Sequence, residues 1–456
     1  MVVLYNLALI AALVVSAPWW LLRMARAGKY RAGLRERLGQ VPLRIRAGEK
    51  RGGIWIHAVS VGEVLAIAKL AEELRRDHPQ LPLFISTTTA AGQKLARERY
   101  GEENVFYFPL DFGFAIRPYL RALQPHLVIL AETEFWPNFL RLAKQSGARV
   151  AVVNARISDG SLPGYRRWKF WLRRVLANVD LFLAQSEEDQ RRLVAIGAAP
   201  ERVNVSGNLK FDVKPPQKTP LSEDLRRRLQ ASAAFPVLVC GSTVEGEELA
   251  LAGSFQALLR EYPNAFMILA PRHPERFDSV AALISSFDGS HLPGLPRLNF
   301  WRRSQLPADA VLRGGVLLLD SIGELASLYS LATIAIVGGS LVPRGGHNIL
   351  EPAHFGVPIL VGPHTENFRD IISIFQQAQA LRVVRAFREK DEKGNFGQVV
   401  RELLTDSAQR EELGRRAAAV VRDQQGATAR TMASLRTLLP KESAAELAGA
   451  KREIQL

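Results

Sequence analysis

Several side chains that could carry chemistry stand directly after short apolar runs of the sequence. In the stretch IHAVSVGE, the carboxylate of Glu63 falls in the first turn of a predicted helix that Ser60 begins. A carboxylate held there can act as a general base, and the missing Cβ of Gly62 lets a substrate approach the backbone. The spacing Ser-x-x-Glu is also that of a helix capping box, and it recurs at residues 242–245 and 321–324. Glu63 is therefore predicted to be either a base or a structural cap.

A second group lies in the C-terminal half, where the apolar run 334–337 leads into two pairs of glycines. Residues 338–348 (GGSLVPRGGHN) combine those pairs with His347 and Asn348, and a predicted helix that carries Glu351 follows. Glycines before a helix N-terminus expose backbone N–H groups that suit a phosphate. Asn348 and Glu351 also have the spacing of a cap, but a cap needs neither the glycine pairs nor the histidine. This loop therefore predicts an anion site.

Carboxylates and cations follow three further apolar runs. If the strand before Glu132 continued, Glu132 and Glu134 would share one face, and one of them could be forced to keep its proton. The alternative is a solvated loop with one structural salt bridge. Lys210, at the end of the first half, could reach a ligand, and Arg272 and His273 could supply two more cationic donors. Each of these basic sites could equally be ordinary surface.

Several motifs that would assign a different chemistry are absent. The chain has no G-x-G-x-x-G, no G-x-x-x-x-G-K-[ST] and no H-E-x-x-H, and Cys240 is its only cysteine. That cysteine lies in an apolar run and is predicted to be an inert core thiol. No Asp-x-Asp pair is present to hold a divalent ion against a nucleotide diphosphate. We therefore expect no metal in the site, although the eight histidines leave a metal open.

The spacing of the apolar runs predicts the scaffold that positions these groups. A chain of 456 residues is too long for one compact core, and 47% hydrophobic with 23% charged residues is typical of globular proteins. Short strand-like runs alternate with helical patterns on both sides of a segment with three prolines, which indicates two doubly wound α/β lobes with a linker between them. Such sheets bind ligands at the carboxyl ends of their strands. The predicted divisions are an anchor helix 1–22, a basic juxtamembrane segment 23–50, a first lobe 51–212, a linker 213–222, a second lobe 223–440 and a polar tail 441–456.

The N-terminal 22 residues contain no charged side chain. Roughly 20 apolar residues are enough to cross a bilayer as a helix. Trp19 and Trp20 stand at the end of this stretch, where indoles favour the interface, and the basic residues Arg23, Arg26, Lys29 and Arg31 follow it. Because the positive charge comes after the apolar stretch, the positive-inside rule predicts a single-span anchor with its N-terminus outside and the lobes in the cytoplasm. A helix that lies in the membrane interface is the alternative.

The charge balance indicates an anionic partner. Sixty Lys and Arg against 45 Asp and Glu give a net charge of +15, which suits nucleic acid, acidic lipid headgroups or phosphorylated substrates. Residues 165–174 interleave aromatic and cationic side chains, as in surfaces that bind nucleic acid or an acidic membrane. The apolar N-terminus favours the membrane.

Taken in order, these motifs resemble the 3-deoxy-D-manno-octulosonic acid (Kdo) transferases of lipopolysaccharide assembly. The resemblance runs from residue 28 to about residue 367. It is carried by residues 28–39 (GKYRAGLRERLG), 56–63, 132–138 (ETEFWPN), 154–158 (NARIS), 206–212 (SGNLKFD), 241–248 (GSTVEGEE), 270–276 (APRHPER) and 345–353 (GGHNILEPA). Each segment is modest, but their common order over most of the chain is specific. Arg344 departs from the pattern, where an apolar or small residue is expected.

The resemblance implies a GT-B fold, in which two Rossmann-like lobes face a central cleft. It implies CMP-Kdo as donor, a tetraacylated lipid A precursor (lipid IVA) as acceptor, and inversion of the anomeric carbon without a metal or cofactor. Glu63 becomes the general base, and the candidates on the acceptor side are Ser60, Gly62, Glu132 and Glu134. The candidates for donor binding are Lys210, Ser242, Arg272, His273, Gly345, Gly346, His347, Asn348 and Glu351.

The same resemblance implies a location and partners. It places the lobes at the cytoplasmic face of the bacterial inner membrane, against an anionic membrane surface and without nucleic acid. One alternative is another GT-B glycosyltransferase, or a related epimerase, that uses a UDP-sugar. A membrane-tethered binding protein with two lobes would show the same alternation of strands and helices, and a nucleic-acid binder is favoured only by net charge.

Overall fold

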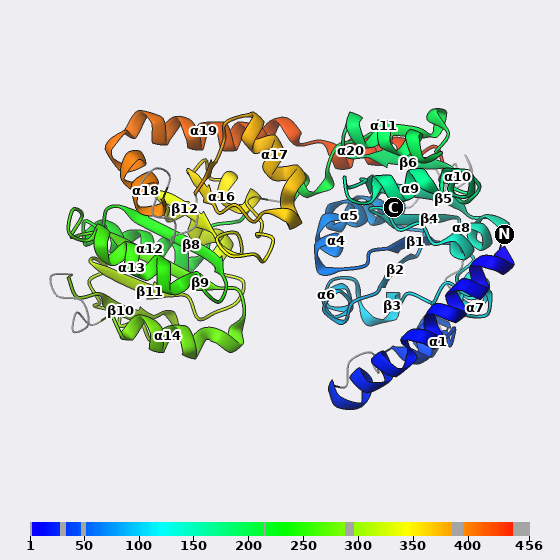
Figure 1. The fold of residues 1–456 in the computed structure, drawn as a ribbon, viewed down its shortest axis with the longest axis horizontal. Helices are drawn as coiled ribbons and strands as arrows, with labels where there is room; N and C mark the ends of the chain where they lie inside the picture. Colours follow the sequence, from blue (N-terminus) through cyan, green and yellow to red (C-terminus); the bar gives the residue numbers. More distant parts are fainter. Residues whose placement is uncertain are drawn as a thin grey trace, which may run out of the picture. The chain divides into compact units, whose positions relative to one another are not determined.

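The computed structural model describes residues 2–27, 33–46, 52–213, 215–287, 296–384 and 395–440 (Figure 1). The chain divides into two compact units. Unit 1 comprises Met1–Val213 together with Gln424–Leu456, and unit 2 comprises Lys214–Asp423. The polar tail predicted over residues 441–456 lies outside the described residues, as do Lys29 and Arg31 of the predicted basic segment.

Unit 1 is built on a seven-stranded parallel sheet in the order β3-β2-β1-β4-β5-β6-β7. Its strands are β1 Ile54–His57, β2 Leu83–Thr87, β3 Val105–Tyr107, β4 Leu127–Ala131, β5 Arg149–Ala155, β6 Leu181–Ala184 and β7 Val203–Val205. Its helices are α1 Val2–Ala27, α2 Leu34–Arg37, α3 Leu43–Arg46, α4 Val61–Ala66, α5 Ala68–Asp77, α6 Ala90–Tyr100, α7 Gly113–Leu123, α8 Pro137–Gln145, α9 Leu162–Arg167, α10 Lys169–Leu176, α11 Glu187–Ile196 and α20 Ala427–Leu435. The 3₁₀ turns are η1 Glu102–Asn104, η2 Pro200–Arg202 and η3 Leu209–Asp212.

The strands of unit 1 are apolar because both faces of the sheet are covered. Trp55 packs with Phe106, Tyr119 and Phe139 on one face, while its neighbour Ile56 belongs to a separate core on the other. Successive side chains of a strand point to opposite faces, so a strand buried on both sides reads as a continuous apolar run.

Unit 2 repeats this architecture with a seven-stranded parallel sheet in the order β10-β11-β9-β8-β12-β13-β14. Its strands are β8 Val237–Thr243, β9 Phe266–Pro271, β10 Asn299–Arg302, β11 Gly315–Leu318, β12 Ile334–Val337, β13 Ile359–Val361 and β14 Arg382–Val383. Its helices are α12 Pro220–Ala231, α13 Glu248–Leu258, α14 Phe277–Ser285, α15 Leu325–Leu328, α16 Leu350–Ala353, α17 Arg369–Gln377, α18 Phe396–Thr405 and α19 Ser407–Gln424. Its 3₁₀ turns are η4 Pro274–Arg276, η5 Arg303–Gln305, η6 Tyr329–Leu331 and η7 Glu366–Phe368. The prediction of two doubly wound α/β lobes is confirmed.

The proline-rich segment is shorter than the predicted linker 213–222. Pro220 is already the first residue of α12, and the Thr219 hydroxyl caps this helix by accepting the N–H of Ser222. Proline suits the first helical position because its missing N–H would have no partner there. Pro215 and Pro216 lie outside any helix or strand.

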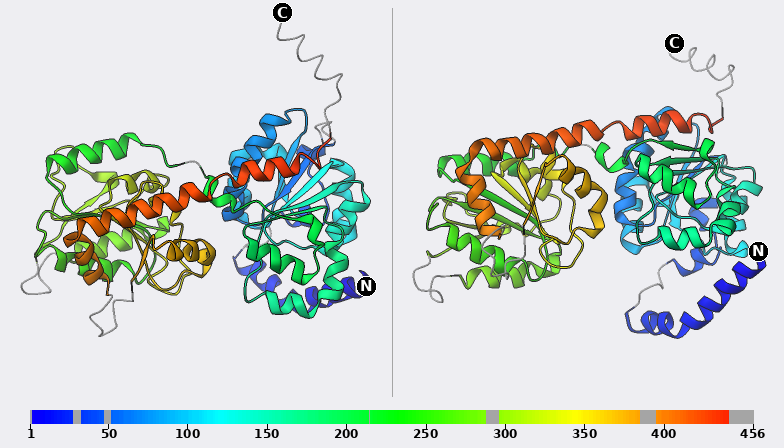
Figure 2. Two further views of the ribbon diagram at one scale, coloured as in Figure 1. Left: turned by 90° about the horizontal axis from the view of Figure 1, so that it is seen from above. Right: turned by 45° about the horizontal axis from the view of Figure 1, so that its top comes forward.

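The C-terminal helix α20 belongs to unit 1, although the predicted second lobe extended to residue 440 (Figure 2). Met432 and Leu435 are buried in the same core as the helix α5. The carboxylate of Asp212 accepts the N–H of Gly426 at 2.7 Å and that of Thr428, so it caps the start of α20. The buried apolar side chains and the Asp212 cap together hold α20 against unit 1.

Helix α1 covers the segment predicted as an anchor, and its first turn rests on unit 1. The Tyr5 hydroxyl donates to Asp111 at 2.9 Å, and Asn6 accepts a hydrogen bond from the Asn138 side chain at 2.6 Å. These contacts place the start of α1 on the lobe, whereas the predicted single span would carry it across a bilayer core about 30 Å thick. The predicted single-span orientation, with the N-terminus outside and the lobes in the cytoplasm, is therefore unsupported.

A search of the described residues finds no helix that combines the length and the apolarity needed to cross a membrane.

Candidate active site

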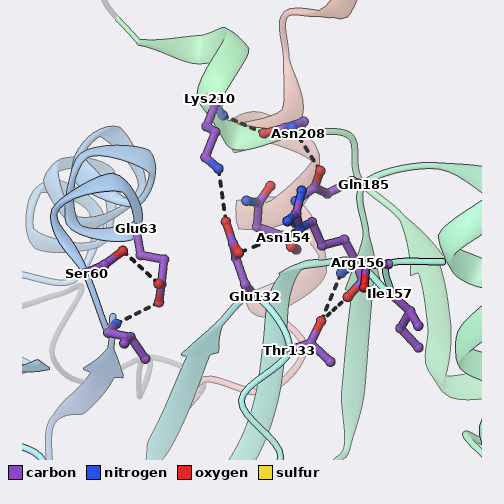
Figure 3. A network of polar contacts seen from close by, with 12 residues as sticks. Ser60, Glu63, Glu132, Thr133, Asn154, Arg156, Ile157, Gln185, Asn208 and Lys210 are labelled. Atoms are coloured by element: carbon purple, nitrogen blue, oxygen red, sulfur yellow. Dashed lines mark hydrogen bonds and ion pairs between the residues drawn. The ribbon is translucent and has the colours of Figure 1, made fainter. Parts of the chain in front are cut away.

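Glu63 lies at the start of α4, beside the carboxyl end of the central strand β1 (Figure 3). One carboxylate oxygen accepts the N–H of Val59 at 2.6 Å, and the other accepts the Ser60 hydroxyl at 2.9 Å. In a capping box the serine hydroxyl would accept a backbone N–H, but Ser60 makes no such bond and donates to Glu63 instead. The capping box predicted as the alternative is therefore formed only in part, because Glu63 accepts a backbone N–H just before the helix and Ser60 accepts none. Gly62 beside it is exposed, and an added Cβ would meet only the Ser60 hydroxyl, at 3.9 Å.

The surroundings of Glu63 make it a weak acid. Burial raises its pKa to about 7, while the Val59 N–H and the Ser60 hydroxyl act in the opposite direction. The nearby carboxylates of Glu132 and Glu134 raise the pKa further, because like charges disfavour ionisation. A carboxylate that titrates near neutral pH is matched to the task of a general base.

Glu132 follows β4, the strand next to β1, and its backbone leaves the strand conformation. Its φ of 58° is in the left-handed region, so Glu132 and Glu134 do not continue β4 as one face. The Glu132 carboxylate lies 3.1 Å from Nζ of Lys210 and 3.9 Å from Nε of Arg156 (Figure 3). A non-glycine residue in this region costs on the order of 1–3 kcal/mol, and such residues cluster at functional sites.

Lys210 is held by the turn η3, which two asparagines fix. Asn208 caps the turn by accepting the N–H of Lys210 at 3.0 Å, and Asn154 accepts the N–H of Leu209 at 3.0 Å. Lys210 was grouped with the donor-binding candidates, and the structure brings it to Glu132, one of the acceptor-side candidates. Asn154 has a φ of 54° where β5 ends, which is a second left-handed residue at this edge of the sheet. Sequence reasoning assigned roles to neither Asn154 nor Arg156, although both follow a predicted strand.

Glu134 is the third carboxylate of this edge. Burial raises its pKa, the contact with Trp136 lowers it, and the charge of Glu132 raises it again. Glu63, Glu132 and Glu134 therefore form an electrostatically coupled set, in which Lys210 and Arg156 pair with Glu132. Together they place the carboxyl of Glu63, with its near-neutral pKa, near two further carboxylates, one of which is paired with two cations.

In unit 2, a buried glutamate holds the loop that follows β12. Glu247 has no exposed surface, and its carboxylate accepts the N–H groups of Val244, Gly339 and Leu341, each at 2.9 Å. Burial raises its pKa, and these three hydrogen bonds lower it. Sequence reasoning gave Glu247 no role, because two of its partners lie more than 90 residues away in the chain.

The loop held by Glu247 contains the predicted anion site. Gly339 has a φ of 69°, and an added Cβ would stand 2.7 Å from the His347 ring. Gly345 and Gly346 also have positive φ, and the Gly346 N–H donates to the Gly339 carbonyl at 2.8 Å. The glycines let the chain fold back on itself, so that His347 lies against the start of the loop.

His347 is a half-buried, neutral histidine. Burial lowers its pKa to about 4, and the positive charges of Arg272 and His273 lower it further. Within the part of the chain that the structure describes, its buried Nε2 has no hydrogen-bond partner. The electrostatic coupling shows that His347 lies near Arg272 and His273, the residues that follow β9.

Glu351 completes the group in unit 2. Burial raises its pKa, while a 3.3 Å hydrogen bond from Asn348 and the charge of Arg272 lower it. The predicted anion site depended on the dipole of the helix that carries Glu351. That helix, α16, has only four residues, so its dipole is weak. Asn348 caps α16 by accepting the N–H of Leu350 at 3.1 Å. Ser242, at the end of β8, has a φ of 56°.

Among the described residues, no three His, Cys, Asp or Glu side chains gather in a way that could hold a metal ion. The contacts described above divide the candidate site residues into two sets: one around Glu63 in unit 1, and one around Arg272 and His347 in unit 2.

Comparison with known proteins gives the relatives of this chain. A family model described as 3-deoxy-D-manno-octulosonic-acid transferase (kdotransferase) matches residues 32–213. The 3-deoxy-D-manno-octulosonic acid transferase of Haemophilus influenzae is 34% identical over 397 residues, which cover 85% of this chain and 88% of that protein. The same enzyme from Bordetella pertussis is 33% identical over 433 residues, or 91% of this chain and 94% of that protein.

Among solved structures, UDP-GlcNAc 2-epimerase from Neisseria meningitidis bound to UDP-GlcNAc matches with a TM-score of 0.54. The match covers 84% of this chain and all of that chain, at 14% identity. At this identity the likeness shows the two-lobed fold alone.

Proposed function

The chain belongs to the family of 3-deoxy-D-manno-octulosonic acid transferases and is therefore a glycosyltransferase, and we propose that it transfers Kdo from CMP-Kdo to the lipid A precursor lipid IVA. The reaction is proposed to invert the anomeric carbon, to need no metal ion or cofactor, and to take place at the cytoplasmic face of the inner membrane. The observation that carries this proposal is the near-neutral carboxyl of Glu63 at the end of β1.

Glu63 serves as the general base. Its carboxylate takes the proton of the acceptor hydroxyl while the hydroxyl oxygen forms a bond to the anomeric carbon of Kdo. The bond from that carbon to the phosphate oxygen breaks, and CMP leaves with the electron pair. Attack on the face opposite the leaving group inverts the configuration. Ser60 and the Val59 N–H hold the Glu63 carboxylate in place for this step.

Unit 2 is proposed to bind the donor. CMP carries a single phosphate, and Arg272, with neutral His347 and the backbone N–H groups of the glycine loop, could stabilise its charge as it departs. Glu351 would bind the ribose hydroxyls. Lys210 remains the candidate for the Kdo carboxylate, with Glu132 as its partner in the free enzyme.

The acceptor is proposed to reach unit 1 from an anionic membrane surface. Trp168 is 64% exposed and Phe170 is 73% exposed, and they alternate with Arg167 and Lys169. Helix α1 adds an exposed apolar side that includes Leu4. Aromatic and apolar side chains next to cations suit the headgroup region of an anionic bilayer.

A transfer assay with the full-length protein in detergent micelles tests the proposal. Incubation with CMP-Kdo and lipid IVA should give a product heavier by one or more Kdo units, and CMP should compete with the donor while UDP does not. Transfer from a UDP-sugar, or its epimerisation, in place of transfer from CMP-Kdo would overturn the proposal and favour the UDP-sugar alternative.

A further inference from the structure

Asp111 is a buried carboxylate that caps helix α8 from a distant part of the sequence. It is 4% exposed, and its two oxygens accept the N–H groups of Asn138 at 3.1 Å and Phe139 at 2.7 Å. These are the first N–H groups of the helix, because Pro137 at its first position has none. The residue before the helix, Trp136, makes no side-chain cap. Asp111 therefore fixes where α8 begins.

The first turn of α1 completes this cap. The Tyr5 hydroxyl donates to the same carboxylate at 2.9 Å, and the Asn6 side chain accepts a 2.6 Å hydrogen bond from the Asn138 amide. That amide also donates to the Asp111 carbonyl at 2.6 Å, so both of its N–H groups are used. The Tyr5 ring lies 5.8 Å from the Trp171 ring on α10. Two residues of the N-terminal helix thus join a network that otherwise belongs to α8.

The loop that carries Glu132 and Glu134 ends where α8 begins. Residues 132–136 connect the end of β4 to Pro137, so both ends of this short loop are fixed by the elements that flank it. Displacing the start of α8 must therefore move Glu134, and it would loosen the contact between Glu132 and Lys210. Both carboxylates act on the pKa of Glu63.

We propose that Tyr5 and Asn6 are positioning residues for the transfer reaction, because they hold the start of α8, through Asp111 and Asn138, and with it the 132–136 loop. The inference deepens the proposed function and rests on Glu63 as its base. It makes the N-terminal helix part of the catalytic half of the enzyme in addition to any role at the membrane. The consequence is specific: when the loop loosens, Glu132 and Glu134 act less strongly on Glu63, and the weaker repulsion between like charges lowers its pKa.

The experiment compares the full-length wild type with the double variant Tyr5→Phe/Asn6→Ala in detergent micelles that hold lipid IVA. Phenylalanine keeps the ring next to Trp171 and removes only the hydroxyl. We expect kcat to fall on the order of ten-fold, as a misplaced catalytic group does, with KM for CMP-Kdo unchanged. The acidic limb of the profile of kcat/KM against pH should shift to lower pH. The amides of Asn138 and Phe139 should exchange hydrogen faster.

Tyr119→Phe is the matched control. Tyr119 is a buried tyrosine of unit 1 whose hydroxyl donates to the Glu36 carbonyl at 3.0 Å, so the substitution also removes a tyrosine hydroxyl that donates a hydrogen bond, but one that is not made to the α8 cap. It should lower stability without moving the acidic limb. Asp111→Asn is a second test, because an amide cannot accept both helix N–H groups, and it should shift the limb in the same direction and further.

The outcomes separate this inference from the proposed function. If the wild type transfers Kdo and the Tyr5→Phe/Asn6→Ala variant has the kcat and pH profile of Tyr119→Phe, the positioning role is overturned while the transferase assignment stands. A loss of activity in vesicles with an unchanged profile in micelles would assign the two residues to membrane attachment and also overturn it. If the wild type releases no CMP with lipid IVA, the proposed function itself fails.

Discussion

Each unit places a glutamate after the first strand of its sheet, and the two glutamates differ in what surrounds them. Glu247 in unit 2 accepts three backbone N–H groups, which tie the ends of β8 and β12 together. Glu63 in unit 1 accepts one backbone N–H and one hydroxyl, and two other carboxylates act on it. Burial raises the pKa of both. The number of N–H donors therefore separates the carboxylate that holds a loop from the one that can exchange a proton.

A third glutamate shows that sequence spacing does not make this distinction. Glu324 accepts a hydrogen bond from the hydroxyl of Ser321, three residues earlier, as Glu63 does from Ser60. It also forms a 3.0 Å ion pair with Arg303, whereas the charged groups that act on Glu63 are carboxylates. Identical spacing thus gives a half-buried, ion-paired glutamate in one unit and a weak acid in the other.

The largest expected effect follows from replacing Glu63. Glu63→Gln keeps the size of the side chain and removes the base, so we expect kcat to fall by about 10²–10⁴-fold while CMP binding is retained. Glu324→Gln is the control with the same spacing, and its activity should equal that of the wild type. Mass measurement of the lipid product gives the rates. Full activity of Glu63→Gln would remove this residue from the mechanism.

Replacing Glu247 should instead affect stability. The glutamine of Glu247→Gln has one acceptor oxygen and turns an NH₂ group toward a backbone N–H, so the free energy of unfolding of unit 2 should fall by about 3 kcal/mol. Denaturant unfolding followed by proteolysis of unit 2 measures this change. Glu63→Gln should show no comparable loss. An unfolding midpoint for Glu247→Gln equal to that of the wild type would break the distinction between the two glutamates.

The smallest effect concerns the pH profile. A base with a pKa of about 7 predicts that kcat/KM rises as pH approaches 7 and is level above it. Glu132→Gln removes one of the negative charges that raise the pKa of Glu63, so the acidic limb should move to lower pH. The shift is expected to be modest because burial is the largest cause of the raised pKa. A limb that moves to higher pH would contradict this account.

The same raised pKa predicts how Glu63 affects stability. The folded protein favours the protonated carboxyl, so the contribution of Glu63 is most favourable below its usual pKa and is lost as pH rises toward 7. Unfolding of unit 1 measured at several pH values should show this loss in the wild type and not in Glu63→Gln.

The strands and the position of Glu63 could be predicted because their signals are local. A strand such as β1 is buried on both faces and reads as a continuous apolar run, and Glu63 follows it within one helical turn. Asp111 and Glu247 could not be found in this way, because each binds two backbone N–H groups in a segment distant along the chain. Every residue except proline has a backbone N–H, so residue types do not show which of these groups a buried carboxylate will bind.

The pairing of Lys210 with Glu132 was missed for a related reason. The two residues are 78 positions apart, and the contact depends on left-handed backbone at Glu132 and on the asparagines that fix η3. The sequence also predicted a single-span anchor for α1, because its apolar composition is visible in the sequence. The hydrogen bonds that Tyr5 and Asn6, at its N-terminal end, make with the lobe are not visible there.

The return of α20 to unit 1 has a consequence for the newly made chain. Asp212, which caps the start of α20, lies two residues after Lys210 in η3, so α20 helps to hold the turn that carries the lysine. A ribosome must therefore translate all of unit 2 before unit 1 can finish folding, although domains generally fold in order from the N-terminus. A premature stop codon near residue 424 would remove the N–H groups that Asp212 binds, and would thereby disturb the setting of Lys210 in the first half of the chain.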